Sequence, residues 1–397
     1  MISFTIDIPI FPKGSALSLL SLYIHIPWCV QKCPYCDFNS HALKGELPET
    51  AYLKTLQQDL DQDLQIYRPG REIHSIFIGG GTPSLFSPAG LGTMLEDINR
   101  KLPFAQDIEI TMEANPGTVE QQRFQGFKAA GINRLSLGIQ SFQPDKLKAL
   151  GRIHDDQQAI NAVLAAKKAG FDNINIDLMY GLPKQSLEQA LNDLQIGAAL
   201  ETTHLSWYQL TLEPNTAFHH KPPPLPDDDL TWVMQEQGQA FLTQQNFINY
   251  EVSAYARAHS SHDYRCRHNL NYWSFGDYLG IGAGAHGKIT CQTTGKIQRY
   301  WKTKHPKNYL DSNTPYLEGT KDLTKQELPF EFMLNALRLY QPIPISWLQQ
   351  SCDLELKEIA APLEKAKALG LLEWDEHFLQ TTQQGRRYMN DLLQLFL

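Results

Sequence analysis

The strongest constraint on the fold is an alternation of short apolar runs and longer amphipathic stretches between residues 20 and 255. Each run is rich in Ile, Leu, Val and Tyr and ends in Gly, Pro or a polar residue, which is typical of buried parallel strands. The runs are LSLYIHIP, EIHSIFIGGG, DIEITMEANP, INRLSLGIQSF, FDNINIDLMYGLP and HLSWYQLTLEP. Because parallel neighbours need crossover helices, six strand–helix units predict an α/β fold. Six units fall short of the eight of a closed TIM barrel, so we expect an open, partial (β/α)6 barrel.

The stretches between these runs predict helices. The apolar positions that recur at steps of three and four, and so share a helix face, are Leu53, Leu56, Leu60, Leu64 and Tyr67, and then Leu91, Leu95, Ile98 and Leu102. Further helices are expected over 118–130, 155–170, 186–200 and 227–245, and a seventh strand over 248–256. KPPPLPDDD at 221–229 predicts an exposed linker.

After about residue 300 the pattern changes. Helices are expected over 326–345, 353–369 and 385–395, with a hairpin in GLLEWDEHFLQTTQQG between the last two. Helices followed by a hairpin indicate a small helical, winged-helix-like domain. The predicted division is therefore an N-terminal tail (1–22), a barrel (23–310) and a C-terminal winged-helix-like domain (311–397).

Composition excludes several classes of protein. The 397 residues are 42% hydrophobic and 20% charged, which allows a sizeable core. A net charge of -8 argues against a nucleic-acid partner. No run of 18 apolar residues predicts a membrane span, and no basic segment precedes the first apolar run as in a secretory signal. Three of the six cysteines fall within one eight-residue segment, unlike a disulfide framework, so we expect a cytoplasmic protein.

That cysteine segment is the sharpest chemical signal. CVQKCPYC places Cys29, Cys33 and Cys36 at a CxxxCxxC spacing directly after the first strand. Three thiolates in a short loop can bind three corners of a [4Fe–4S] cluster and leave the fourth iron open. Zinc, which usually takes four protein ligands, and three unrelated structural cysteines are the alternatives. The loop follows the carboxyl end of a barrel strand, where active sites of barrels are built.

Polar residues also end the other predicted strands. GGGTPS, at Gly79–Ser84, lets the backbone approach a ligand closely, although a plain strand-to-helix turn is an equal explanation. Glu113, Gln140, Asp177 and Thr211 lie at or near the ends of the next four strands. Polar groups on one rim, together with the cysteine loop, predict a site for a ligand that carries several polar groups.

A second candidate site lies in the segment CRHNLNYW, residues 266–273. On a helix, His268 and Tyr272 share a face, and Trp273 follows them. An imidazole with flat aromatic neighbours suits axial ligation of haem iron and contact with a porphyrin face. An aromatic core helix with a hydrogen-bonded histidine is the alternative.

These motifs resemble a known family. CxxxCxxC after the first strand of a partial barrel resembles the radical S-adenosylmethionine (SAM) superfamily, and YIHIPWCVQKCPYCDF resembles its oxygen-independent coproporphyrinogen III oxidase family. HNxxYW is similar to the pattern of the haem-chaperone branch of that family. The resemblance runs from Tyr23 to the final helix and implies a [4Fe–4S] cluster, whose open iron chelates SAM, and haem as a ligand.

The resemblance also implies roles for individual residues. For SAM they are Tyr23 and Tyr35 beside cluster and adenine, Gly80, Gly81 and Thr82 at the amino group, Glu113 at the ribose or amino group, Gln140 at the ribose, Arg152 and Asp177 at the carboxylate and ribose, and Thr211 at the adenine by its backbone. For haem, His268 is the leading axial ligand, with Tyr272 and Trp273 as an apolar wall.

Two functions of different class compete. One is a haem chaperone that delivers haem to haemoproteins, membrane-associated respiratory acceptors included. The other is an oxygen-independent coproporphyrinogen III oxidase, and another radical SAM enzyme is a third reading. In the oxidases a cysteine follows two places after the third, where this chain has Phe38, and a long extension precedes the motif, where this chain has 22 residues before Tyr23. These differences and the intact HNxxYW favour the chaperone; SAM cleavage and a homodimer stay open.

Overall fold

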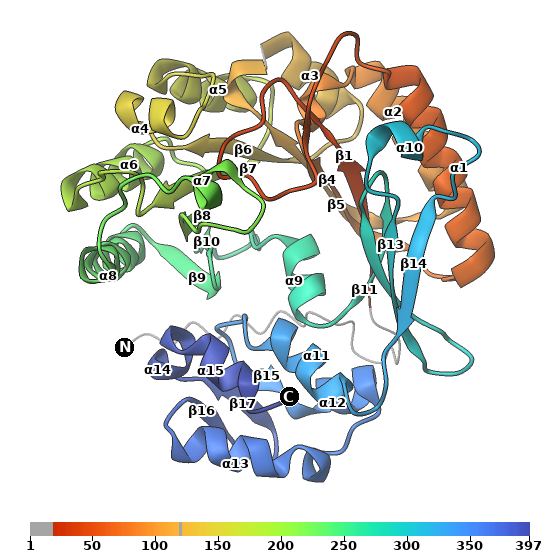
Figure 1. The fold of residues 1–397 in the computed structure, drawn as a ribbon, viewed down its shortest axis with the longest axis vertical. Helices are drawn as coiled ribbons and strands as arrows, with labels where there is room; N and C mark the ends of the chain where they lie inside the picture. Colours follow the sequence, from red (N-terminus) through yellow and green to blue (C-terminus); the bar gives the residue numbers. More distant parts are fainter. Residues whose placement is uncertain (1–18, 119–120) are drawn as a thin grey trace.

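The fold is built on one 12-stranded sheet, most of which is parallel and curves as an open barrel (Figure 1). The computed structural model describes residues 19–118 and 121–397, so most of the expected tail lies outside the described residues. The six predicted strands are adjacent in chain order and parallel, which confirms the partial (β/α)6 barrel. They are β1 (Leu20–Ile26), β4 (Ile73–Gly80), β5 (Phe104–Ala114), β6 (Arg134–Gln140), β7 (Asn173–Tyr180) and β8 (His204–Gln209).

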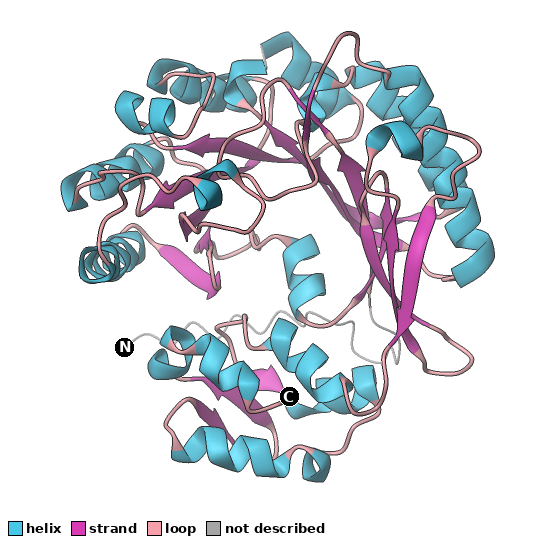
Figure 2. Ribbon diagram, in the orientation of Figure 1, coloured by secondary structure: helices cyan, strands magenta, loops and turns pink. Residues whose placement is uncertain are grey.

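Crossover helices cover the outer face of this sheet (Figure 2). They are α1 (Glu49–Tyr67), α2 (Pro88–Lys101), α3 (Gln121–Ala129), α5 (Asp156–Lys168), α6 (Leu187–Ala199) and α8 (Asp228–Gln244). All six were expected, although residues 119–120 of the predicted 118–130 helix lie outside the described residues. Capping boxes at Asp155 and Ser186 start α5 and α6, because each side chain accepts from a backbone N–H of the first turn.

The two faces of the parallel strands differ in chemistry. Aliphatic residues such as Leu22, Ile24 and Ile78 pack in the core under the helices. The alternate positions, which face inward, are polar or aromatic, and Tyr23 and Phe77 among them are only half-buried. Because strand side chains alternate, the helices bury one face while the concave face stays open to solvent in part. Functional side chains therefore gather on the concave face.

Two expectations at the sheet edges need correction. The predicted seventh strand, 248–256, is a hairpin of β9 (Phe247–Glu251) and β10 (Ala254–Arg257), and β10 pairs antiparallel with β8. The side chain of Asn249 donates to the carbonyls of Glu251 and Ala254 across the turn, so the chain reverses there. A parallel strand next to β1, β11 (Asp277–Ile281), was not expected.

Strand β11 escaped prediction because its glycines weaken the strand signal. Gly280 is required, since a Cβ there would lie 1.9 Å from the His286 carbonyl oxygen of the neighbouring strand. Antiparallel strands extend the sheet beyond it; they are β12 (His286–Thr290), β13 (Ile297–Lys302) and β14 (Leu317–Asp322).

The C-terminal residues form the expected helices and hairpin, and a third strand that was not expected completes a small sheet. The helices are α11 (Leu328–Ala336), α12 (Ile345–Cys352), α13 (Ala360–Ala368), α14 (Gln383–Arg387) and α15 (Met389–Gln394), and the strands are β15 (Ile343–Pro344), β16 (Leu372–Trp374) and β17 (Phe378–Thr381). The predicted hairpin is β16–β17. The predicted 326–345 helix ends early because Pro342 and Pro344 interrupt it, and the predicted 353–369 helix starts late because Asp353 is the left-handed cap of α12. Tyr388 divides the predicted 385–395 helix.

Short elements complete the fold. They are β2 (Trp28–Cys29), β3 (His41–Ala42), α4 (Pro144–Ala149), α7 (Ala217–His220), α9 (Arg267–Trp273), α10 (Pro306–Tyr309) and the 3-10 turns η1 (Pro83–Leu85), η2 (Pro116–Thr118) and η3 (Leu356–Glu358). Helix α9 packs against β1, β4 and β11 on one side and α11 on the other, so it joins the barrel to the C-terminal helices (Figure 1). Within 19–118 and 121–397, no helix has the length and apolar character needed to span a bilayer.

Candidate functional site

The cysteine loop follows β1 at the carboxyl end of the sheet. Cys29, Cys33 and Cys36 are half-buried and free of disulfides. The loop is closed by backbone bonds, because the Cys36 N–H donates to the Cys33 carbonyl at 3.2 Å and the Leu43 N–H to the Cys29 carbonyl at 2.8 Å. The three thiols are therefore held in one short, ordered loop, as their spacing predicts.

The chemistry of these thiols fits a cationic iron cluster. Burial raises the pKa of Cys29, a hydrogen bond with Thr82 opposes this, and the charges of Cys36 and Cys33 raise the pKa further. Thiolates close enough to repel each other are stabilised by a shared cation. Among the described residues, no three His, Cys, Asp or Glu side chains are gathered tightly enough to hold a single metal ion. The donor set fits the cluster that the family implies, and the ligand assignment stays a prediction.

The glycine segment at the end of β4 is hydrogen-bonded to the backbone at the start of the cysteine loop. The Gly81 N–H donates to the Ile26 carbonyl at 2.6 Å and the Thr82 N–H to the Trp28 carbonyl at 2.7 Å. A Cβ on Gly81 would lie 2.5 Å from the Trp28 oxygen, so only glycine permits this approach. Because the amides are used within the chain, the segment can offer a ligand ammonium only acceptor oxygens.

Two carboxylates face each other across the inner side of the sheet. Glu113, near the end of β5, accepts from the Gly80 N–H at 3.0 Å. Burial raises the pKa of Glu113 to about 7, and the charge of Asp177 adds to the rise. Burial also raises the pKa of Asp177, which accepts from Asn175 at 2.8 Å and Ser136 at 3.1 Å. A ligand with positive ammonium and sulfonium groups, such as SAM, would relieve the repulsion between the two.

Gln140 and Arg152 complete the rim beside these carboxylates. Gln140 has a left-handed backbone with φ of 73°, and its side-chain oxygen accepts from the Tyr208 hydroxyl at 2.8 Å. Arg152 donates to the Gly138 carbonyl at 2.5 Å and to Cys33 Sγ at 3.6 Å. Its Nε has no partner among the described residues, so a donor remains for a ligand carboxylate. Tyr208 was missed, although its alternate position in the sixth run points to the same face.

Tyr23, Tyr35 and Thr211, the remaining predicted SAM residues, have different surroundings. The Tyr23 hydroxyl lies 2.9 Å from His25 Nδ1, while His25 Nε2 lies 2.9 Å from the Asn39 carbonyl. A carbonyl only accepts, so Nε2 carries the proton and Tyr23 donates. Tyr35 lies within the cysteine loop, and its ring centroid is 6.4 Å from that of Phe218. Thr211 is exposed, two residues beyond the end of β8.

His268 lies inside the concave face, with 9% of its surface exposed. Its ring centroid is 5.3 Å from Phe77 and 6.4 Å from Tyr23, and its Nδ1 is 3.4 Å from the Ser75 hydroxyl. Burial lowers the pKa of His268 to about 3, and the charge of Arg134 contributes, so the imidazole is neutral. The helix places a neutral histidine between flat rings.

The neighbours of His268 in the motif, Tyr272 and Trp273, contact each other edge to face, with ring centroids 4.9 Å apart. Tyr272 packs against Tyr278 of β11, with ring centroids 5.0 Å apart. The Arg338 guanidinium lies over the Trp273 ring, with its central carbon 4.9 Å from the ring centroid. Tyr272 therefore stays with the sheet while Trp273 contacts the C-terminal helices.

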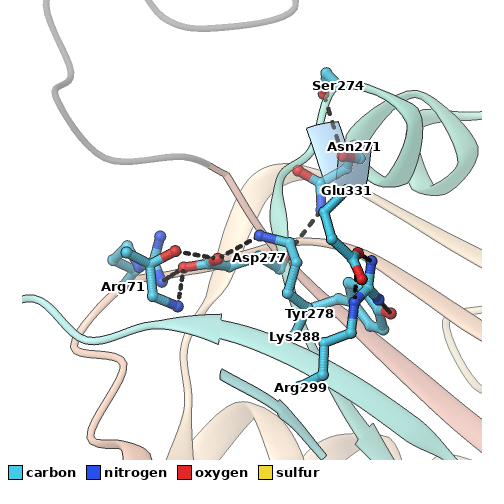
Figure 3. Close-up of polar contacts among 9 residues, drawn as sticks. Arg71, Asn271, Ser274, Asp277, Tyr278, Lys288, Arg299 and Glu331 are labelled. Carbon is cyan, nitrogen blue, oxygen red and sulfur yellow. Dashed lines mark hydrogen bonds and ion pairs between the residues drawn. The ribbon is translucent and has the colours of Figure 1, made fainter. Parts of the chain in front are cut away.

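A polar network fixes α9 between the two parts of the protein (Figure 3). The Asn271 side chain donates to the Asp277 carbonyl at 2.9 Å. Arg299 of β13 donates to the Tyr278 hydroxyl at 3.4 Å and binds the Glu331 carboxylate of α11 at 2.6 Å. At the other end of α9, the Arg267 N–H donates to the Glu109 carboxylate at 2.9 Å. Spacing could not reveal Glu109, because only the register of β5 turns it toward α9.

Comparison with known proteins agrees with this geometry. The radical SAM superfamily model matches residues 23–195, and the HemN C-terminal domain model matches residues 323–388. The proteins named heme chaperone HemW are 51% identical in Haemophilus influenzae and 52% in Escherichia coli, each over 95% of this chain and 98% of its own. A mouse protein, radical S-adenosyl methionine domain-containing protein 1, is 35% identical over 96% of this chain and 87% of its own.

Among solved structures, coproporphyrinogen III oxidase (HemN) from Escherichia coli, a radical SAM enzyme, superposes with a TM-score of 0.80. It is 25% identical and covers 96% of this chain and 91% of its own. The radical SAM resemblance seen in the cysteine motif is confirmed, and the family implies a [4Fe–4S] cluster and SAM. With about half of its positions identical to the HemW relatives over nearly the whole length, the chain belongs to the HemW family of the radical SAM superfamily.

Proposed function

We propose that the chain is a haem chaperone, which binds haem, holds SAM at a [4Fe–4S] cluster and passes haem to acceptor haemoproteins. The observation that carries this proposal is the 51–52% identity, along nearly the full length, to proteins named heme chaperones. The HNLNYW segment, which places a neutral imidazole among aromatic rings, supports it. The acceptors include membrane-associated respiratory haemoproteins, and the chaperone works in the cytoplasm.

The cofactor site is the rim around the cysteine loop. Cys29, Cys33 and Cys36 hold the cluster, which when bound supplies an iron with an open coordination position and one-electron chemistry. The residues that bind SAM are Tyr23, Tyr35, Gly80, Gly81, Thr82, Glu113, Gln140, Arg152, Asp177 and Thr211. The paired carboxylates attract the cationic groups of SAM, and the free Nε of Arg152 meets its carboxylate.

The haem site is the concave face beside α9. His268 would bind the haem iron, because an imidazole binds iron in its neutral form and burial lowers the pKa of this one to about 3. In the tautomer whose Nδ1 donates to the Ser75 hydroxyl, 3.4 Å away, Nε2 carries no proton and would be the nitrogen that binds iron. Tyr272 and Trp273, whose rings are in edge-to-face contact, would form an apolar wall for the porphyrin.

A second candidate is oxygen-independent coproporphyrinogen III oxidase, favoured by the TM-score of 0.80 to that enzyme. Phe38 argues against it. This residue occupies the position of the extra cysteine in the oxidases, and its side chain is 60% exposed on the cysteine loop. A loop without that thiolate lacks a group that the oxidase resemblance requires.

Haem transfer separates the two candidates. The anaerobically reconstituted chain, loaded with haem, is mixed with an apo-haemoprotein, and a parallel sample receives coproporphyrinogen III, SAM and a reductant. The chaperone proposal expects the Soret band to move to that of the acceptor and the porphyrinogen to stay unconverted. Robust formation of protoporphyrinogen without haem transfer would make the oxidase the better account. Sedimentation of the same sample distinguishes a monomer from a homodimer.

A further inference from the structure

Arg134, the first residue of β6, is a buried guanidinium without an ion pair. It is 2% exposed and lies on the concave side of the sheet. Its Nη1 donates to the Thr111 hydroxyl at 3.5 Å, which is a long bond, and its Nε has no acceptor. In the part of the chain that the structure describes, no Asp or Glu oxygen lies within 4.0 Å of it. A buried charge left this way is strongly unfavourable, so it calls for a partner.

Glu109, a carboxylate whose charge acts on Arg134, already accepts hydrogen bonds from other groups. Glu109 influences Arg134 electrostatically, but its Oε1 accepts from the Arg267 N–H at 2.9 Å and from Cys266 Sγ at 3.6 Å. The carboxylate therefore caps α9 instead of pairing with the guanidinium. The Nε of Arg134 is therefore left without an acceptor among the described residues.

Arg134 lies within electrostatic reach of His268, whose neutral state it favours. The rings of Phe77 and Tyr23 lie beside this imidazole, with centroids 5.3 and 6.4 Å from it. A flat apolar group can pack on these rings while a charged arm reaches Arg134. A ligand of that shape combines a planar macrocycle with a carboxylate at its edge.

The charge balance selects the class of anion. The carboxyl groups of Glu109 and Asp177 also act on Arg134, so a singly charged carboxylate meets less repulsion there than a doubly charged phosphate. A carboxylate also matches the planar fork of the guanidinium in a bidentate pair.

We propose that Arg134 binds a propionate carboxylate of haem whose iron is held by His268. The inference rests on the proposed haem function, and it assigns the second anchor of the ligand. The two residues have different roles. His268 binds the iron, and Arg134 orients the macrocycle by binding a propionate at its edge.

The test compares haem with its dimethyl ester, which has no free carboxylates, by Soret titration. Wild type should bind haem about ten- to hundred-fold more tightly than the ester, as expected for one charge-assisted pair. In Arg134→Met, haem should fall to the affinity of the ester, while ester affinity and the Soret position stay unchanged because the iron ligand is intact. Arg134→Lys should retain part of the preference.

Arg257→Gln is the matched control. This arginine is half-buried and donates to the Thr202 and Ala198 carbonyls, away from the concave face, so its removal should keep the full preference for haem. The wild-type comparison needs no variant and stands if a substitution lowers the yield of folded protein. Equal binding of haem and ester by wild type, or equal loss of both in Arg134→Met, overturns this inference alone. Failure of wild type to bind either removes the proposed function as well.

Discussion

At the scale of single residues, the chemistry of the protein depends on a few inward side chains with shifted pKa values. Burial raises the pKa values of both Glu113 and Asp177, and the charge of Asp177 raises the pKa of Glu113 further. His268 is neutral for the same reason of burial. Burying such ionisable side chains without a ligand costs folding free energy, and side chains with shifted pKa values are typical of binding sites.

The first prediction concerns SAM affinity and pH. Because the pKa of Glu113 is raised to about 7, the free site is largely protonated below that pH and ionised above it. A cationic ligand prefers the ionised form, so SAM affinity should rise as pH increases through about 7. Glu113→Gln should abolish this dependence and weaken binding by about 1.5–3 kcal/mol, which calorimetry measures. A wild-type affinity and pH profile in the variant would count against the assignment.

A second residue-scale prediction tests the fit of β4 under the cysteine loop. Gly81→Ala places a methyl group where the Trp28 carbonyl lies, so it should lower the free energy of unfolding by about 1–3 kcal/mol and reduce the iron retained on reconstitution. Gly92→Ala, inside α2 and 3.3 Å from Ala130, is the control and should change neither quantity much. Equal iron content in the two variants would mean that the glycine does not shape the loop.

At the scale of elements, local patterns predicted most of the barrel and left out what depends on neighbours. The six strands with continuous aliphatic runs, and the cysteine loop between the first strand and helix, were recognisable because their signals are local. Strand β11 was not, since Gly280 makes sense only against His286 of β12. Glu109 and Arg134 were missed because their position depends on the register between β5 and β6.

The cysteine loop carries the next prediction. Cys29, Cys33 and Cys36 should bind about four iron and four sulfide per chain, and replacement of all three by Ala should remove both. Cys291 is exposed and Cys352 is buried among the C-terminal helices, so Ala at either position should leave iron content unchanged. Chemical analysis of iron and sulfide in each variant tests whether these three cysteines bind the cluster. A native protein that holds zinc without iron would refute the cluster.

Helix α9 carries a prediction of its own. Glu109→Ala removes the carboxylate that accepts from the first N–H of α9, and it also removes a negative charge that acts on Arg134. The free energy of unfolding should therefore fall by about 1–3 kcal/mol. Denaturant unfolding measures the change. Asp107→Ala is the control, because that carboxylate contacts the exposed side chain of Arg267 and should matter little. Equal stability of the two variants would show that Glu109 does not hold the helix.

At the scale of the whole molecule, α9 is the joint between the barrel and the C-terminal helices (Figure 1). Arg299 and Glu331 connect the sheet extension to α11 across the same region. A haem held beside α9 is therefore in contact with a segment that both parts position. This arrangement suits a protein that must hold a ligand and release it, since a shift of either part changes the site.

The most direct test of the account is haem titration of the anaerobically reconstituted protein, wild type against His268→Ala. We expect wild type to show a Soret band that saturates at one haem per chain. The variant should lose or shift that band while its iron–sulfur content and SAM affinity stay unchanged, because the described hydrogen bond of the His268 side chain goes to Ser75, outside the cysteine loop and the SAM residues. An unaltered Soret band and affinity in His268→Ala would contradict the proposed haem site, and no saturable binding by wild type would contradict the chaperone function itself.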